Sequence, residues 1–171
     1  DAVANYQAGT YIGKDSIRTH LYRNVGGGQV GENGLPDNRL YNHINLQPVV
    51  HLLPGGQTAK GRWRALAMFG GFGGGATWAE GVYEMTYAKV GGVWKISNLD
   101  YHSGFGAPYA TGWVPPEPQP PGGGGRGPRN LPHPADRPRA EACGGFPAAC
   151  VGPFHYTNPG ATDAGHVWTT V

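Results

Sequence analysis

The strongest constraint on the fold is the stretch from Thr77 to Trp113, which consists of two runs of strand-forming residues joined by Gly91 and Gly92. Both runs are rich in aromatic and β-branched side chains, which favour extended backbone. A two-residue hairpin turn requires positive φ, and glycine adopts it without a steric penalty. The sequence therefore predicts an antiparallel β-hairpin centred on Gly91-Gly92, in a fold built on a sheet.

The turn also predicts which residues of this hairpin lie opposite one another. If Val90 lies across from Val93, an uninterrupted ladder gives these further pairs: Lys89 with Trp94, Tyr87 with Ile96, Met85 with Asn98, and Tyr83 with Asp100. Side chains alternate between the two faces of a strand, so Tyr83, Asp100 and His102 should share one face. A β-bulge near Gly81 would break this assignment.

A second pair of strands is predicted upstream. Apolar side chains occupy alternate positions from Arg39 to Leu53, and the alternation resumes from Thr58 to Phe69 after a Pro-Gly-Gly turn. If Gly55-Gly56 is that turn, the two apolar rows fall on one face. The same register groups polar residues on the other face: His43, Gln47 and His51 beside Arg62, Arg64 and Met68. Pro48 lacks an N–H, which predicts an edge strand or a bulge.

The first residues predict two short elements. The segment from Asp1 to Tyr11 suits a single strand that ends near Gly9. Asp15 or Ser16 can then cap a helix of about two turns that runs to Asn24.

Glycine and proline are concentrated in the C-terminal part of the chain. The 171 residues suffice for about one domain, and more than half of residues 115–140 are Pro or Gly. Such a stretch cannot build a core and reads as an extended linker. We therefore expect a domain over residues 1–114, a linker over 115–140, and a tail over 141–171 whose aromatic residues dock on its own domain or on a neighbour.

Charge and hydropathy exclude two classes of partner. The net charge is +2, and Lys and Arg are scattered along the chain rather than clustered, so a nucleic-acid partner is not expected. No apolar run reaches the roughly 20 residues of a membrane-spanning helix, so no membrane span is expected.

The only cysteines, Cys143 and Cys150, enclose a short flexible loop in which a disulfide is sterically plausible. A bridge favours an exported protein, either periplasmic or extracellular, whereas two free thiols would suit the cytosol. Two cysteines without histidines at finger spacing do not make a metal site. Cofactor signatures are also absent, and we expect no metal and no cofactor.

Five segments resemble one known family. They read GTYIGKDSIRTHL, NHINLQPVVHL, GQTAKGRWRAL, WAEGVYEMTYAKVGGVWKISNL and PYATGW. Together they are similar to the SnoaL-like branch of the nuclear transport factor 2-like superfamily, over about Asp1 to Trp113. The later CGGFPAACVGPFHYTNP resembles a C-terminal extension of one subgroup.

The resemblance implies an α+β fold in which a cone-like, strongly curved and mostly antiparallel sheet wraps around helices, with a hydrophobic pocket between them. Here few helices are expected, because the two N-terminal helices of the family pattern are absent before Asp1. Members are commonly dimers, so self-association as a dimer or a larger assembly is expected. They include cofactor-free dehydratases, isomerases and cyclases as well as pocketed proteins without known activity.

The resemblance also points to His43, since dehydratase and isomerase relatives use a histidine on the strand that NHINLQPVV resembles. A neutral imidazole could remove a proton at an activated carbon. In the relatives its Tyr and Asp partners come from the N-terminal helices. The alternative places His43 on the solvated side of the sheet.

A second candidate cluster combines Tyr83 with Asp100 and His102, because a carboxylate beside an imidazole can fix its tautomer and raise its basicity. Cross-strand packing explains these residues equally well. Glu80 and Glu84 are expected to be surface or interface groups. Three tryptophans are expected to line a core or pocket wall: Trp63, Trp78 and Trp94.

Two functions therefore compete. The sequence favours a small-molecule-binding or assembly-forming domain whose tail packs on itself or on a neighbouring subunit. The alternative is a cofactor-free lyase or isomerase that acts on a hydrophobic, oxygenated small molecule with His43 as general base.

Overall fold

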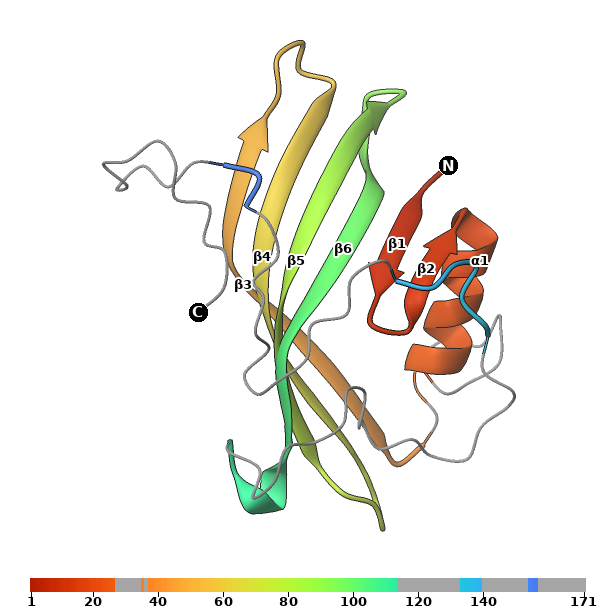
Figure 1. Cartoon of the computed structure of the whole chain (residues 1–171), viewed down its shortest axis with the longest axis vertical. Coiled ribbons are helices and arrows are strands. Elements are labelled where there is room, and N and C mark those ends of the chain that lie inside the picture. Colours follow the sequence, from red (N-terminus) through yellow and green to blue (C-terminus); the bar gives the residue numbers. More distant parts are fainter. Residues whose placement is uncertain (27–34, 36, 114–132, 140–153, 157–171) are drawn as a thin grey trace.

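A computed structural model describes residues 1–26, 35, 37–113, 133–139 and 154–156. Its centre is one six-stranded sheet with the order β2-β1-β6-β5-β4-β3. β1 is parallel to β6, and every other neighbouring pair is antiparallel. The strands are β1 (Val3–Tyr6), β2 (Gly9–Ile12), β3 (Arg39–Leu52), β4 (Thr58–Gly71), β5 (Thr77–Val90) and β6 (Val93–Pro108). The expected curved, mostly antiparallel α+β sheet is confirmed (Figure 1).

Two long hairpins form most of the sheet. Gly91 and Gly92 connect β5 to β6 with φ of 59° and 80°, and Val90 pairs with Val93 as expected. Gly55 and Gly56 connect β3 to β4 in the same way, also with positive φ. Both turns follow from the freedom of glycine at positive φ.

The ladder between β5 and β6 contains two bulges, and they correct the predicted pairing. The register shifts between Thr86 and Tyr87, and again between Glu80 and Gly81. Between these shifts Tyr83 pairs with Tyr101, and Glu84 pairs with Asp100. Each extra residue on β6 reverses the faces of the side chains that follow it. The prediction that Tyr83 shares a face with Asp100 and His102 was therefore wrong.

A third bulge interrupts the pairing of β3 with β4. The register shifts between Leu46 and Val49, where Gln47 has φ of 48° and Pro48 lacks an N–H. The prediction that Pro48 marks an edge strand or a bulge is confirmed on both points. On the N-terminal side of this bulge, His43 pairs with Ala67, not with Met68. The grouping of His43 with Arg62, Arg64 and Met68 was therefore wrong.

The first residues form a hairpin rather than one strand. β1 and β2 pair tightly, with Ala4 opposite Tyr11, and Gly9 begins the second strand instead of ending the first. A helical segment follows as predicted, made of α1 (Lys14–His20) and the π-helical turn η1 (Leu21–Val25). Gly13 occupies its N-cap, so the predicted cap at Asp15 or Ser16 was wrong.

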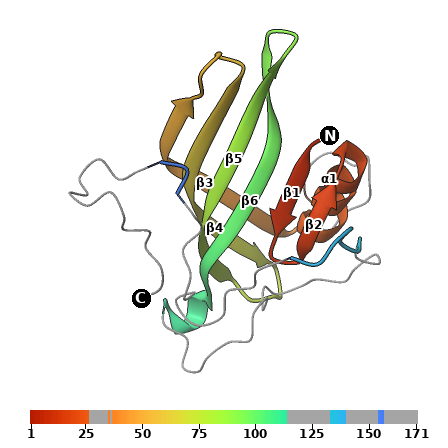
Figure 2. The same ribbon diagram turned by 45° about the horizontal axis from the view of Figure 1, so that its top comes forward.

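The two faces of the sheet differ, and α1 identifies one of them. His20 of α1 stacks on Tyr11 with ring centroids 3.9 Å apart, and Tyr6 lies 4.7 Å from His20. We call this side the helix face. Pairing continues it across the sheet through these residues: Ala4, Leu99, Tyr101, Tyr83, Ala65, Ala67 and His43. Figures 1 and 2 both show α1 beside the β1–β2 hairpin.

The opposite side, the tail face, contacts residues that follow the domain in sequence. Arg139 binds Asp100 and His155 binds Glu84 on this face. The short helix η2 (Tyr109–Thr111) ends β6, and Trp113 packs on Trp78 at 5.0 Å. No helix in the described part of the chain is long and apolar enough to cross a membrane.

Residues 133–139, which we call the strap, lie along the free edge of β2 (cyan in Figure 2). Thr10 N–H donates to the carbonyl of Arg137 at 2.8 Å, and Asp136 N–H donates back to the Thr10 carbonyl at 2.9 Å. Ile12 N–H donates to the Asp136 carboxylate at 2.6 Å. This part of the predicted linker is thus docked on the sheet and covers an edge strand.

We predict that His20 makes stability dependent on pH. It is 4% exposed, and burial lowers its pKa from 6.5 to about 4. The unfolded chain takes up this proton near pH 6.5, so stability should fall as pH falls from 6.5 towards 4, by roughly 3 kcal/mol.

Urea denaturation of the wild type and of His20→Phe at several pH values measures this effect. The Phe ring preserves stacking on Tyr11 but cannot be protonated, so its pH dependence should be flatter. If the free energy of unfolding changes equally with pH in the two proteins, His20 is not the group responsible.

Candidate functional site

His43 lies on the helix face of the edge strand β3, held between aromatic rings. Its ring is parallel to that of Tyr41, with centroids 5.0 Å apart and 2° between the planes. Phe69 is tilted against both rings at 4.5 and 5.4 Å. His43 pairs with Ala67, which is 1% exposed and leaves room for the imidazole. The solvated placement considered from the sequence is therefore wrong.

The two nitrogens of His43 have different surroundings. Nδ1 lies 3.3 Å from the hydroxyl of Tyr83. Nε2 is buried and has no hydrogen-bond partner among the described residues. A buried polar atom without a partner is costly in a folded protein and calls for an explanation, such as a bound molecule.

Burial sets the protonation states at this site. It lowers the pKa of His43 below 6.5, raises the pKa of Tyr41 to about 12, and raises the pKa of Tyr83 above its usual 10. At neutral pH the imidazole is therefore uncharged, and both phenols keep their protons.

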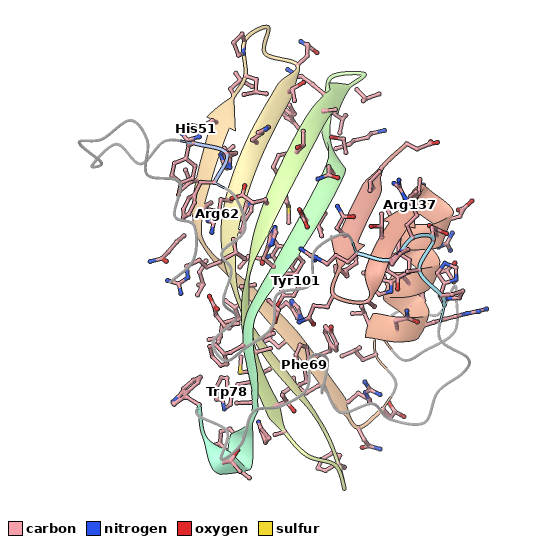
Figure 3. The ribbon with its side chains drawn as sticks, in the orientation of Figure 1. His51, Arg62, Phe69, Trp78, Tyr101 and Arg137 are labelled. Carbon is pink, nitrogen blue, oxygen red and sulfur yellow. The ribbon has the colours of Figure 1, made fainter. Side chains whose placement is uncertain are left out.

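Tyr101 completes the group, and it is the residue that sequence reasoning missed. Its ring packs on Tyr83 with centroids 4.7 Å apart. Gly81 admits this ring, because a Cβ there would lie 2.6 Å from it and from the carbonyl oxygen of His102. Tyr101 reaches this position because of the bulge at Ser97, and a serine inside a strand gives no signal for a bulge in the sequence. We call His43, Tyr41, Phe69, Tyr83 and Tyr101 the aromatic cluster; Figure 3 labels Phe69 and Tyr101.

The central part of the sheet separates charged from aromatic side chains. Along residues 61–69, 79–87 and 99–103, these charged residues all project from the tail face: Arg62, Arg64, Glu80, Glu84 and Asp100. The helix face carries aromatic and small residues instead. The rings of the aromatic cluster are half-buried, and the floor between them is formed by Ala65, Ala67 and Gly81. This surface suits an uncharged, largely apolar molecule.

Asp100 and His102 lie together but on the tail face. His102 Nε2 is 3.3 Å from the Asp100 carboxylate, and Arg139 contacts both residues. The hydrogen bond from His102 and the nearby guanidinium hold the pKa of Asp100 below its usual range. The sequence correctly grouped this pair but assigned it to the face of Tyr83.

The three tryptophans singled out from the sequence do not line one wall. Trp63 lies on the helix face opposite Tyr83, and its indole N–H donates to the Tyr87 hydroxyl at 2.9 Å. Trp78 packs with Tyr109 and Trp113 at the far end of the tail face (Figure 3). Trp94 is 41% exposed near the β5–β6 turn, beneath the Lys89 ammonium. Only Trp63 adjoins the aromatic cluster.

The glutamates of β5 are ion-paired on the tail face. Glu80 pairs with Arg64 at 3.2 Å, and Glu84 pairs with Arg62 and with His155. Close by, Phe154 lies 3.9 Å from the Arg62 guanidinium.

His51 and His155 approach to 3.2 Å on the same face. In the described ranges, no three His, Cys, Asp or Glu residues are grouped so as to hold a metal ion. Cys143 and Cys150, with the rest of the tail apart from 154–156, lie outside the described residues.

The tautomer of His43 decides what the aromatic cluster can do. If Nδ1–H donates to the Tyr83 oxygen, Nε2 keeps a free lone pair and the phenolic O–H is available to a ligand. The site then offers one base, Nε2, and one hydrogen-bond donor, the Tyr83 O–H, which are the two kinds of group needed to remove a proton beside a carbonyl. In the other tautomer Nε2–H is a second donor.

We predict that Gly81→Ala disturbs the aromatic cluster. The added methyl group would meet the Tyr101 ring and the His102 backbone, so the ring must move. The near-UV circular dichroism of the tyrosines should change and the melting temperature should fall. Gly70→Ala is the control, because its Cβ would meet nothing closer than 3.9 Å. Equal effects from both substitutions would contradict the packing.

Comparisons with known proteins agree with this architecture. A profile of the SnoaL-like domain family matches residues 1–100. No curated protein matches the chain. A solved structure of a hexachlorocyclohexane dehydrochlorinase, LinA Type2, superposes with a TM-score of 0.50 at 20% identity, covering 71% of this chain and 74% of that chain.

A second structure, hexachlorocyclohexane dehydrochlorinase LinA-type3 from Novosphingobium barchaimii LL02, has a TM-score of 0.48 and 24% identity, and covers 68% of this chain and 75% of that one. At 20% identity, the likeness to LinA Type2 is evidence of the fold alone. The family profile spans more than half of the chain, and the chain therefore belongs to the SnoaL-like domain family.

Proposed function

We propose that the helix face binds an uncharged, largely apolar, oxygenated small molecule and that His43 removes a proton from it. The protein would then be a cofactor-free lyase or isomerase. The family supports a small-molecule-binding or cofactor-free enzyme domain in general; the substrate face and the base are our assignments.

One observation carries the proposal: His43 Nε2 is buried and unpartnered among the described residues, while Nδ1 is held by Tyr83. An imidazole in an ordinary structural role would use both nitrogens or expose one to water. His102 Nε2 is buried in the same way, but the Asp100 carboxylate lies 3.3 Å from it, whereas no polar group of the described residues is recorded beside His43 Nε2. Here one nitrogen is left for a molecule that the aromatic cluster would surround.

The proposed step moves one proton. Neutral His43 takes a proton from a carbon next to a carbonyl, and the electron pair left behind moves to the carbonyl oxygen. The Tyr83 O–H donates a hydrogen bond to that oxygen. If the substrate has a β,γ double bond, the dienolate takes the proton from His43 at the γ-carbon, which is an isomerisation. If it has a β-hydroxyl group, the enolate expels this group, which leaves as water with the proton held by His43, and this is an elimination. Neither outcome needs an oxidant or a reductant.

The second candidate is a binding protein without turnover. It is favoured by the partner of His43, which is a phenol rather than a carboxylate, whereas Asp100 lies on the other face. Without a nearby negative charge the imidazolium formed in the step gains less stabilisation. The assembly role expected from the sequence stays a prediction, because the described tail contacts lie within one chain.

We predict that the wild type accelerates hydrogen exchange at the α-carbons of 2-tetralone in D2O, followed by proton NMR. This uncharged bicyclic ketone fits the character of the helix face, and the assay detects proton removal whatever the natural substrate is. His43→Ala should lower the catalysed rate by about 100-fold or more, as expected for loss of a general base.

His51→Ala is the matched control, since it removes a histidine from the same strand on the tail face, and it should leave the rate unchanged. Binding of 2-tetralone without exchange would favour the second candidate. Exchange that survives His43→Ala would remove His43 as the base.

We also predict the pH dependence of this exchange. Only neutral His43 can accept the proton, and burial lowers its pKa below 6.5. The catalysed rate should therefore rise with pH through a midpoint below 6.5 and be level near pH 7. A midpoint above 6.5 would contradict a buried histidine base.

A further inference from the structure

On the tail face, the strap contacts β6 through the side chain of Arg139. Arg139 is the last described residue of the strap, and its side chain is 16% exposed against β6. One nitrogen of its guanidinium, Nη1, donates to the backbone carbonyl of Tyr101 at 2.5 Å. The other, Nη2, lies 3.1 Å from the Asp100 carboxylate and 3.2 Å from His102 Nδ1. One planar group thus contacts three consecutive residues of β6.

Those residues belong to a short stretch whose register is set locally. The two bulges of the β5–β6 ladder lie on either side of residues 99–103. A slip of one residue within this stretch would exchange its faces, so that Tyr101 would leave the helix face and Asp100 and His102 would enter it. The contacts of Arg139 with Asp100 and His102 exist only while these two side chains are on the tail face.

Electrostatics on the tail face would otherwise oppose the observed register. Glu84 and Asp100 are direct cross-strand partners, and like charges in such positions repel. Arg62 and His155 contact Glu84. On the Asp100 side, the compensating groups are Arg139 and His102. Removal of Arg139 would therefore destabilise the strand register that places Tyr101 on the helix face.

We propose that Arg139 is a positioning residue for the aromatic cluster: from the strap, it holds residues 100–102 in the register that places Tyr101 against Tyr83 and so holds the Tyr83 hydroxyl at His43. The catalytic part of this inference rests on the proposed function. The effect on the arrangement of the cluster does not.

The strap also offers a matched control. Arg137 lies two residues away, and its backbone N–H and carbonyl bond to Thr10 of β2. Arg137→Gln removes the same charge from the same segment and preserves these backbone bonds. Any general effect of strap charge should appear in both Arg137→Gln and Arg139→Gln.

The first measurement needs no substrate. The pKa of His43 is followed by the NMR signals of its ring protons in the wild type, Arg139→Gln, Arg139→Lys and Arg137→Gln. Loosening of the cluster admits water, so the His43 pKa should rise towards 6.5 in Arg139→Gln. Lysine keeps the charge but cannot bind three groups in a plane, so Arg139→Lys should be intermediate. Arg137→Gln should match the wild type.

The second measurement is the exchange of 2-tetralone. Arg139→Gln should lower the catalysed rate by about tenfold with little change in ketone affinity, as expected for misplaced catalytic groups. A His43 pKa and an exchange rate in Arg139→Gln equal to those of Arg137→Gln would overturn the proposal. If Arg139→Gln does not fold, the same two quantities are compared between Arg139→Lys and Arg137→Gln, and equal values would overturn the proposal. If the wild type shows no exchange, the proposed function fails, and the His43 pKa still tests the positioning role.

Discussion

The pairing of β5 with β6 is the constraint on which the rest of the structure depends. A ladder without interruptions would place Asp100 and His102 beside Tyr83. The bulge at Ser97 advances β6 by one residue, so Tyr101 occupies that place and Asp100 and His102 turn to the other face. Because side chains alternate strictly along a strand, this single choice separates charge from aromatic surface across the centre of the sheet.

The separation explains why the two faces have different partners. The tail face presents Glu84 and Asp100 side by side. The positively charged Arg139 contacts Asp100, and His155, which is positively charged when protonated, contacts Glu84. The helix face presents rings around His43 over a floor of Ala65, Ala67 and Gly81. Histidine in this setting is uncharged at neutral pH, which suits a base for an apolar molecule and not a ligand for an anion.

Sequence reasoning succeeded where local chemistry decides the structure. Both glycine pairs form the expected turns, and Val90 pairs with Val93 across the turn between β5 and β6 as predicted. Pro48 marks the bulge on an edge strand. It failed where one extra residue in a strand exchanges the faces of the side chains that follow it. The extra residue Ser97 of β6 carries no strong local signal, yet it turned Tyr101 towards Tyr83. Pro48 indicated a bulge but not its effect, which was to pair His43 with Ala67 and place its ring in the aromatic cluster. The docking of the strap was also missed, since a Pro-rich segment reads as a linker until its bonds to Thr10 are seen.

The central claim is that Tyr101, and not His102, shares a face with Tyr83. Nuclear Overhauser effects between the side chains of β5 and β6 test it directly, because they report proton pairs closer than about 5 Å, the separation of side chains that lie opposite each other on one face. The account predicts a contact between the ring protons of Tyr83 and Tyr101, together with one between Val82 and His102. A contact between Tyr83 and His102, with none between Tyr83 and Tyr101, would contradict it.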